Sequence, residues 1–145
     1  MPNVRGLNHK YGISKHRFKE LYYFCLQYSE WRDTLNYNTS TVKSPIITDM
    51  PITHSNSSAT ERLAINRAEL LKKCELVEQT AIETDADLYQ YIIKAVTNEG
   101  ITYNYLTMVM NMPCGKDMYY DRRRRFYWLL DKKMKEPYSQ DKSIV

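Results

Sequence analysis

The chain has 145 residues and a formal net charge of +4 at pH 7. Its length suits one domain, and its apolar content of 43% excludes a globally disordered chain. No apolar run approaches the roughly 18 residues of a membrane span, and no signal peptide is recognisable. The three cysteines form no CxxC pair, which is typical of reduced thiols in an intracellular protein. We therefore expect a cytoplasmic protein that does not contact a membrane.

Positive charge is concentrated towards the two ends of the chain. Residues 1–20 carry five basic and one acidic side chain, and residues 115–135 carry eight basic and three acidic ones. The intervening residues 21–114 carry seven basic and eleven acidic side chains. This asymmetry indicates an anionic partner for the ends of the chain.

Helical periodicity dominates the N-terminal part of the sequence. An amphipathic helix is expected from Lys15 to about Gln27, with Ser14 as its N-cap. A short helix over residues 30–35, capped by Ser29, is expected to follow. The apolar positions of these two helices are Phe18, Leu21, Tyr22, Cys25, Leu26, Trp31 and Leu35.

A polar stretch then interrupts the helical pattern. Residues 37–57 are rich in Asn, Ser and Thr and contain two prolines, which predicts a flexible loop or linker. We therefore divide the chain into an N-terminal helical segment (1–36), this loop, a helical core (58–136) and a tail (137–145).

A long helix is expected to open the helical core. Ser58 and Glu61 have the spacing of a capping box, which predicts a helix from residue 58 to about Glu83. Its apolar residues cover a wide arc, so we expect the helix to lie between others. The residues expected to face inward are Leu63, Ile65, Leu70, Leu71, Cys74, Val77 and Ala81.

Two shorter helices are expected next. Asp85 is the expected cap of a helix over residues 88–97, and Gly100 suits the left-handed position after its end. Thr102 is the expected cap of a short helix over residues 103–111.

The last predicted helix follows Gly115 and stops before Pro137. One side of it forms an apolar stripe of Tyr119, Phe126, Leu129 and Leu130. The same helix carries four consecutive arginines at positions 122–125. An apolar stripe combined with a dense cationic run suits a helix that lies against a polyanion.

The order of the last three helices is that of a helix-turn-helix, whose final helix enters the major groove with its N-terminal half. Arginine also offers a planar fork that fits phosphates and guanine edges. Two plainer interpretations stay open: a solvated helix face, and a three-helix packing unit with a basic surface. The candidate DNA-binding residues are Lys116, Asp117, Tyr120, Arg123, Arg124 and Arg125.

Several motifs in this region resemble a known family. The segments 99–106, 112–115, 119–126 and 129–130 look like small phage-encoded regulators of the ArpU and RinA type. The resemblance spans about residues 75–135. It implies a module similar to region 4 of sigma-70 factors, a role in phage transcription regulation, and a place in the cytoplasm of the host bacterium.

The signatures of common enzymes are missing from the sequence. There is no HExxH, GxSxG, P-loop or GxGxxG motif, and the three histidines lack the spacing of metal ligands. Cys114 lies at an expected helix N-terminus without a recognisable partner base, so we expect it to be a turn residue. We therefore expect no enzymatic activity, no cofactor and no metal.

Together, these patterns predict an all-α protein that binds double-stranded DNA. The resemblance implies that it regulates phage genes, with host RNA polymerase as a further partner. The alternative is a phage protein that modulates a host protein or nucleoprotein complex through the same basic helix. RNA polymerase or a defence effector such as a CRISPR nuclease would be such a target.

Overall fold

The structure, a computed structural model, describes residues 11–42 and 55–136, without the side chains of 38–42 and 55–58. All regular elements in these ranges are α-helices, which confirms the prediction of an all-α protein. They are α2 (Lys15–Leu26), α3 (Tyr28–Val42), α4 (Ser55–Thr84), α5 (Tyr89–Thr97), α6 (Tyr103–Met108) and α7 (Lys116–Lys135). None of the helices in these two ranges is both long and apolar enough to cross a bilayer.

The first helix forms as the sequence predicts. The Ser14 side chain accepts a hydrogen bond from the backbone amide of Arg17, at 3.2 Å, and so caps α2. Only Gln27, in a helical conformation, separates α2 from α3, and the amide of Trp31 bonds to the Gln27 carbonyl at 3.0 Å. The predicted cap at Ser29 is therefore wrong, because the chain is already helical there.

The predicted loop is shorter than expected on both sides. α3 continues to Val42, and α4 begins at Ser55, three residues before the expected cap Ser58. Residues 37–42 and 55–57, assigned to the loop from composition, are thus helical. The rest of that loop and the predicted tail lie outside the described residues.

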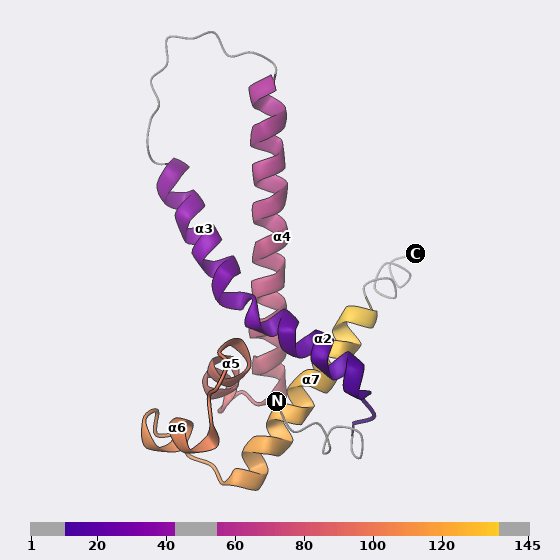
Figure 1. The fold of residues 1–145 in the computed structure, drawn as a ribbon, viewed down its shortest axis with the longest axis vertical. Helices are drawn as coiled ribbons and strands as arrows, with labels where there is room; N and C mark the ends of the chain where they lie inside the picture. The colour runs from indigo at the N-terminus through magenta and orange to yellow at the C-terminus, as the bar shows by residue number, and fades with distance from the viewer. Residues whose placement is uncertain (1–10, 43–54, 137–145) are drawn as a thin grey trace.

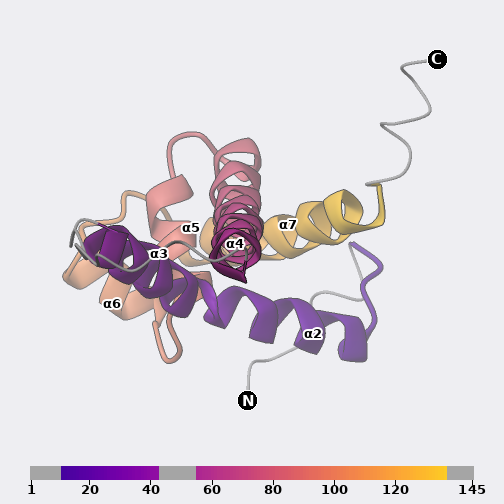
Figure 2. The same cartoon turned by 90° about the horizontal axis from the view of Figure 1, so that it is seen from above.

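The helices share one core around the lower half of α4. Figure 1 shows α2, α5 and α7 gathered there, and Figure 2 shows them surrounding α4 when it is seen end-on. The Phe18 ring of α2 meets the Tyr127 ring of α7 edge-on at 5.0 Å, although the two residues are far apart in sequence. Both side chains are fully buried. The N-terminal segment therefore belongs to the same core as the C-terminal helices.

The α3–α4 pair is held together by contacts that stop halfway up α4. Arg32 pairs with Glu78, the Lys73 ammonium lies 5.6 Å from the centre of the Trp31 ring, and Arg67 donates a 3.0 Å hydrogen bond to the Leu35 carbonyl. Above this point the two helices diverge (Figure 1). We call the upper part of the pair, residues 36–42 and 55–69, the arm; the hydrogen bond from Arg67 to Leu35 lies at its base.

The arm overturns part of the predicted core. Leu63, Ile65 and Leu71 were expected to face inward, but they are 60%, 58% and 43% exposed. Residues 59–69 are all exposed, because α3 diverges from α4 above the hydrogen bond between Arg67 and Leu35. The predicted positions in the lower half are correct, since Cys74, Val77 and Ala81 are buried.

The chain reverses twice before α7. Gly100 has a φ of 80°, a left-handed conformation that glycine adopts without steric cost. α6 ends at Met108, three residues before the predicted end, and Val109 is its C-cap. Asn111 cannot belong to the helix, because it is left-handed with a φ of 57°. The Met112 amide then bonds back to the Leu106 carbonyl at 3.0 Å and closes the turn.

Candidate nucleic-acid interface

The start of α7 is fixed by its neighbours. Gly115 is the N-cap in an extended conformation, and the Tyr103 hydroxyl of α6 donates a 2.9 Å hydrogen bond to the Cys114 carbonyl. The predicted apolar stripe is largely confirmed, since Tyr119, Phe126 and Leu130 are buried while Leu129 is half-buried. This stripe turns one side of α7 towards the core and leaves the other side for solvent or a partner.

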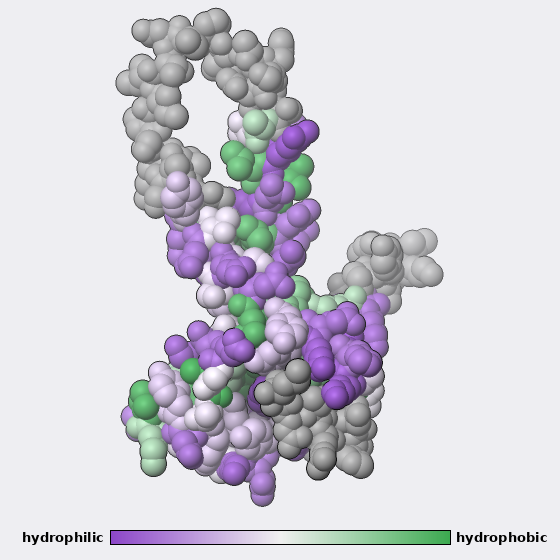
Figure 3. Space-filling view, viewed as in Figure 1, coloured by the Kyte–Doolittle hydropathy of each residue, from purple (hydrophilic) through white to green (hydrophobic). Residues whose placement is uncertain are grey.

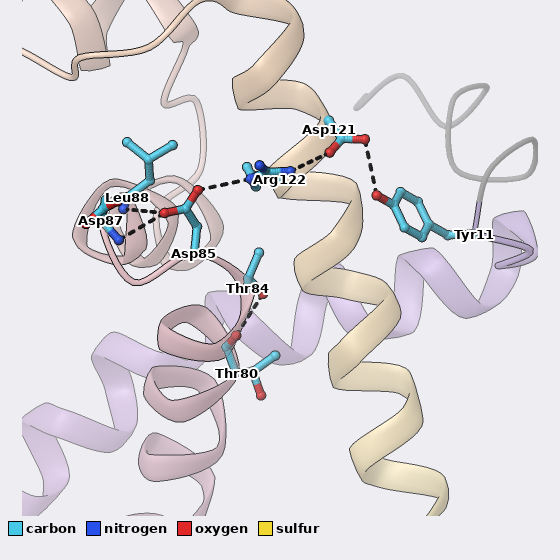
Figure 4. A network of polar contacts seen from close by, with 8 residues as sticks. All are labelled: Tyr11, Thr80, Thr84, Asp85, Asp87, Leu88, Asp121 and Arg122. Atoms are coloured by element: carbon cyan, nitrogen blue, oxygen red, sulfur yellow. Dashed lines mark hydrogen bonds and ion pairs between the residues drawn. The ribbon is translucent and has the colours of Figure 1, made fainter.

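The four consecutive arginines have different environments, and Arg122 is the most constrained. Its Nε donates to an Asp85 carboxylate oxygen at 3.0 Å, and a terminal nitrogen donates to Asp121 at 2.9 Å. The Tyr11 hydroxyl donates to the other Asp121 oxygen at 3.1 Å. Figure 4 shows this chain of contacts from the α4–α5 turn across α7 to the segment before α2. The Arg122 side chain thus stabilises the fold by binding two acids of the same chain.

Asp85 fixes the α4–α5 turn as well as α7. One of its carboxylate oxygens accepts hydrogen bonds from the backbone amides of Asp87 and Leu88, at 2.9 and 3.1 Å. Burial alone would raise the pKa of Asp85, but the hydrogen bonds from Arg122 and these amides outweigh it and hold the pKa below its ordinary value. The prediction that Asp85 caps the following helix is wrong, because the N-cap of α5 is Leu88 and Asp85 accepts hydrogen bonds within the preceding turn. The ion pair between Asp85 and α7 was not predicted from the sequence.

Arg123 lies against the core instead of projecting away from it. Its guanidinium carbon is 5.5 Å from the centre of the Tyr127 ring, which is fully buried. Burial raises the pKa of Tyr127, and the positive charge of Arg123 only partly opposes this. Among the described residues, the buried Tyr127 hydroxyl has no hydrogen-bond partner. Arg123 therefore contributes to packing beneath the surface that was predicted to contact DNA.

The remaining predicted site residues differ in their exposure. Lys116, Asp117 and Arg125 are exposed, while Arg124 and Tyr120 are half-buried. Across the two described ranges, the salt bridges of α7 involve neither Lys116, Arg124 nor Arg125. The Asp117 carboxylate lies in the first turn, where the helix dipole stabilises negative charge.

The outer side of α7 carries an aromatic and cationic cluster that was only partly foreseen. The Trp128 ring lies 5.7 Å from the Tyr11 ring, and the Lys132 ammonium lies 4.1 Å from the centre of Trp128. Trp128 therefore packs against the segment that precedes α2.

The C-terminal half of α7 is tied to α2 by a buried acid. The Asp131 carboxylate accepts a 2.6 Å hydrogen bond from Arg17 Nε and pairs with Lys135 at 3.0 Å. Burial would raise the pKa of Asp131, but these two cations outweigh it and hold the pKa below its ordinary value. Helical spacing within one segment could not reveal this contact, because Arg17 and Asp131 are 114 residues apart.

We expect the Asp131 contact to make stability sensitive to acid. Because its pKa is lower in the folded chain than in the unfolded one, its contribution is complete above about pH 4 and is lost as pH falls through the folded pKa. The Asp131→Asn variant should be less stable than the unsubstituted chain at neutral pH. That difference should shrink in thermal melts as pH falls below about 4. The exposed Asp33→Asn is the matched control, and an undiminished difference for Asp131→Asn at low pH would contradict the assignment.

The cysteines are free, and two of them, Cys25 and Cys74, are buried. Burial and, next, Asp85 raise the pKa of the Cys114 thiol, with Arg122 opposing, so the thiol is protonated at neutral pH. Within residues 11–42 and 55–136, no group of three or more His, Cys, Asp or Glu side chains could hold a metal ion.

Comparison with protein-family models finds no match, and comparisons with curated proteins and with solved structures find none either. The resemblance to small phage regulators therefore stays a prediction from sequence.

Proposed function

We propose that the protein binds double-stranded DNA through the accessible basic side of α7 and acts in the regulation of phage genes. The observation that carries the proposal is that the four arginines at positions 122–125 have different partners. Arg122 and Arg123 are bound to an acid and to a buried ring, whereas Arg124 and Arg125 form no salt bridge with any described residue. Cations without acidic partners on a stable helix suit a polyanionic ligand.

The order of α5, α6 and α7 supports a helix-turn-helix as the DNA-binding unit. α7 would then be the recognition helix, with Lys116 in the first turn that enters the groove. The connection from Met108 to Lys116 spans residues 109–115, which is longer than the three to four residues typical of the motif. The proposal therefore relies on the charge of α7 more than on the turn.

The salt dependence of DNA affinity tests this proposal. We expect Lys116→Ala, Arg124→Ala and Arg125→Ala to weaken binding to a random duplex while the chain stays folded. Each phosphate contact that is lost should lower the slope of log affinity against log salt by about 1. If one of these side chains reads a base edge, its loss of about 1–3 kcal/mol should be confined to the cognate site.

The matched control is Lys72→Ala, which removes an exposed lysine from α4. It should leave both the affinity and the salt slope unchanged. Unchanged binding by the Lys116→Ala, Arg124→Ala double variant, with a normal circular dichroism spectrum, would reject the proposed interface.

A second candidate function is binding to a host protein, and one observation favours it. The turn after α6 and the start of α7 expose large apolar side chains, with Met108, Val109 and Met118 at 81%, 62% and 43%. Exposed methionines are common on protein-recognition surfaces because their flexible side chains adapt to a partner. No retention of duplex DNA at low salt would favour this candidate, in which RNA polymerase or a defence nuclease would be the partner class.

A further inference from the structure

The arm is the part of the described structure that buries the least apolar surface. Leu63 and Ile65 lie two residues apart on α4, so they point to nearly opposite sides of the helix, and both are more than half exposed. Figure 3 shows apolar side chains exposed along this upper part of α4. A helix that is apolar on more than one side is normally packed between other helices.

The helical structure of the arm is also only marginally stable without another helix packed against it. α4 has 30 residues and is therefore about 45 Å long. The portion within the arm, residues 55–69, has the length at which an isolated helix is marginal in water. Packing against another helical surface would stabilise it.

The charges on the arm identify the kind of partner that fits. Residues 59–69 carry two acidic and two basic side chains and are neutral overall, in contrast to the basic α7. Arg62, Ile65 and Glu69 are separated by three and four residues, so they share one face of α4, and all three are exposed. A cation and an anion placed on either side of an isoleucine form a surface that is complementary to itself.

We propose that the arm is a self-association surface whose occupant is the arm of a second copy of this chain. In a twofold antiparallel pairing of the two α4 helices, Arg62 faces Glu69 of the second copy, and the reverse pair forms at the other end. Ile65 then meets the second copy at the centre. In this pairing α4 of each copy covers the Ile65 side of the other α4, while α3 of each copy stays on the opposite side, where Arg67 bonds to Leu35.

Charge reversal in the full-length chain tests this pairing. Sedimentation of the unsubstituted protein, without nucleic acid, should show a monomer–dimer equilibrium. Arg62→Glu and Glu69→Arg should each raise the dimer dissociation constant about tenfold, because twofold symmetry repeats each repulsive contact. The Arg62→Glu, Glu69→Arg double variant should restore dimerisation, since reversing both charges restores two attractive pairs.

Two further variants make the result specific. Ile65→Asp should give a monomer with unchanged helix content, because the Ile65 side chain is 58% exposed. Glu75→Arg, an exposed change on α4 away from this face, should leave the dimer intact. A chain that is monomeric at every concentration would overturn the proposal. A dimer whose dissociation constant changes with neither charge reversal would overturn it as well. Neither outcome bears on DNA binding by α7.

Discussion

Replacing Phe18 with alanine is expected to lower the free energy of unfolding by about 3–5 kcal/mol. The Phe18 side chain is fully buried, and its ring contacts the Tyr127 ring at 5.0 Å between centroids. Its removal leaves a cavity between α2 and α7 that rigid helices cannot fill. Urea denaturation followed by far-ultraviolet circular dichroism measures the change.

The control for Phe18 lies on the same helix. Tyr23 is 57% exposed, so Tyr23→Ala should change the unfolding free energy by no more than about 0.5 kcal/mol. Both variants should unfold in a single transition, because one core joins the N-terminal and C-terminal helices. Two separate transitions would instead support the predicted division at residue 36.

Replacing Arg122 with methionine should cost about 1–3 kcal/mol of stability and leave the helices in place. Methionine roughly keeps the length of the side chain, so the main loss is the donor to Asp85 and Asp121. The Asp85 side chain, only 12% exposed, would keep its two backbone donors and lose its positive partner. Thermal and urea denaturation measure the loss.

The arginine run supplies its own control for this experiment. Arg125 is exposed, so Arg125→Met should change stability by no more than about 0.5 kcal/mol. Equal losses for Arg122→Met and Arg125→Met would show that the Asp85–Arg122 ion pair does not anchor α7.

Local rules recovered the elements of this fold well. Ser14 and Thr102 are caps as predicted, and α5 ends at Thr97, because such features depend on neighbouring residues only. The errors arose where composition was used in place of contacts. The polar residues at 37–42 looked like a loop, yet they extend α3, since low helix propensity is only a weak guide to where a helix ends.

The candidate site was only partly predictable for a physical reason. A helical wheel ranks residues by their angle on one helix and ignores the partners that other helices bring. Arg123 and Arg124 were both candidate DNA-binding residues, although Arg123 lies over the buried Tyr127 ring. The pairs of Arg122 with Asp85 and of Arg17 with Asp131 join distant segments, so no local pattern could reveal them.

The packing of α2 against α7 also has a consequence for synthesis on the ribosome. Arg17 and Asp131 are 114 residues apart, and translation adds about 5–20 residues per second. The apolar face of α2 therefore emerges roughly 6–23 s before the helix that covers it. During that interval the nascent chain has an uncovered hydrophobic surface, which makes α2 the segment where we expect chaperones to bind first.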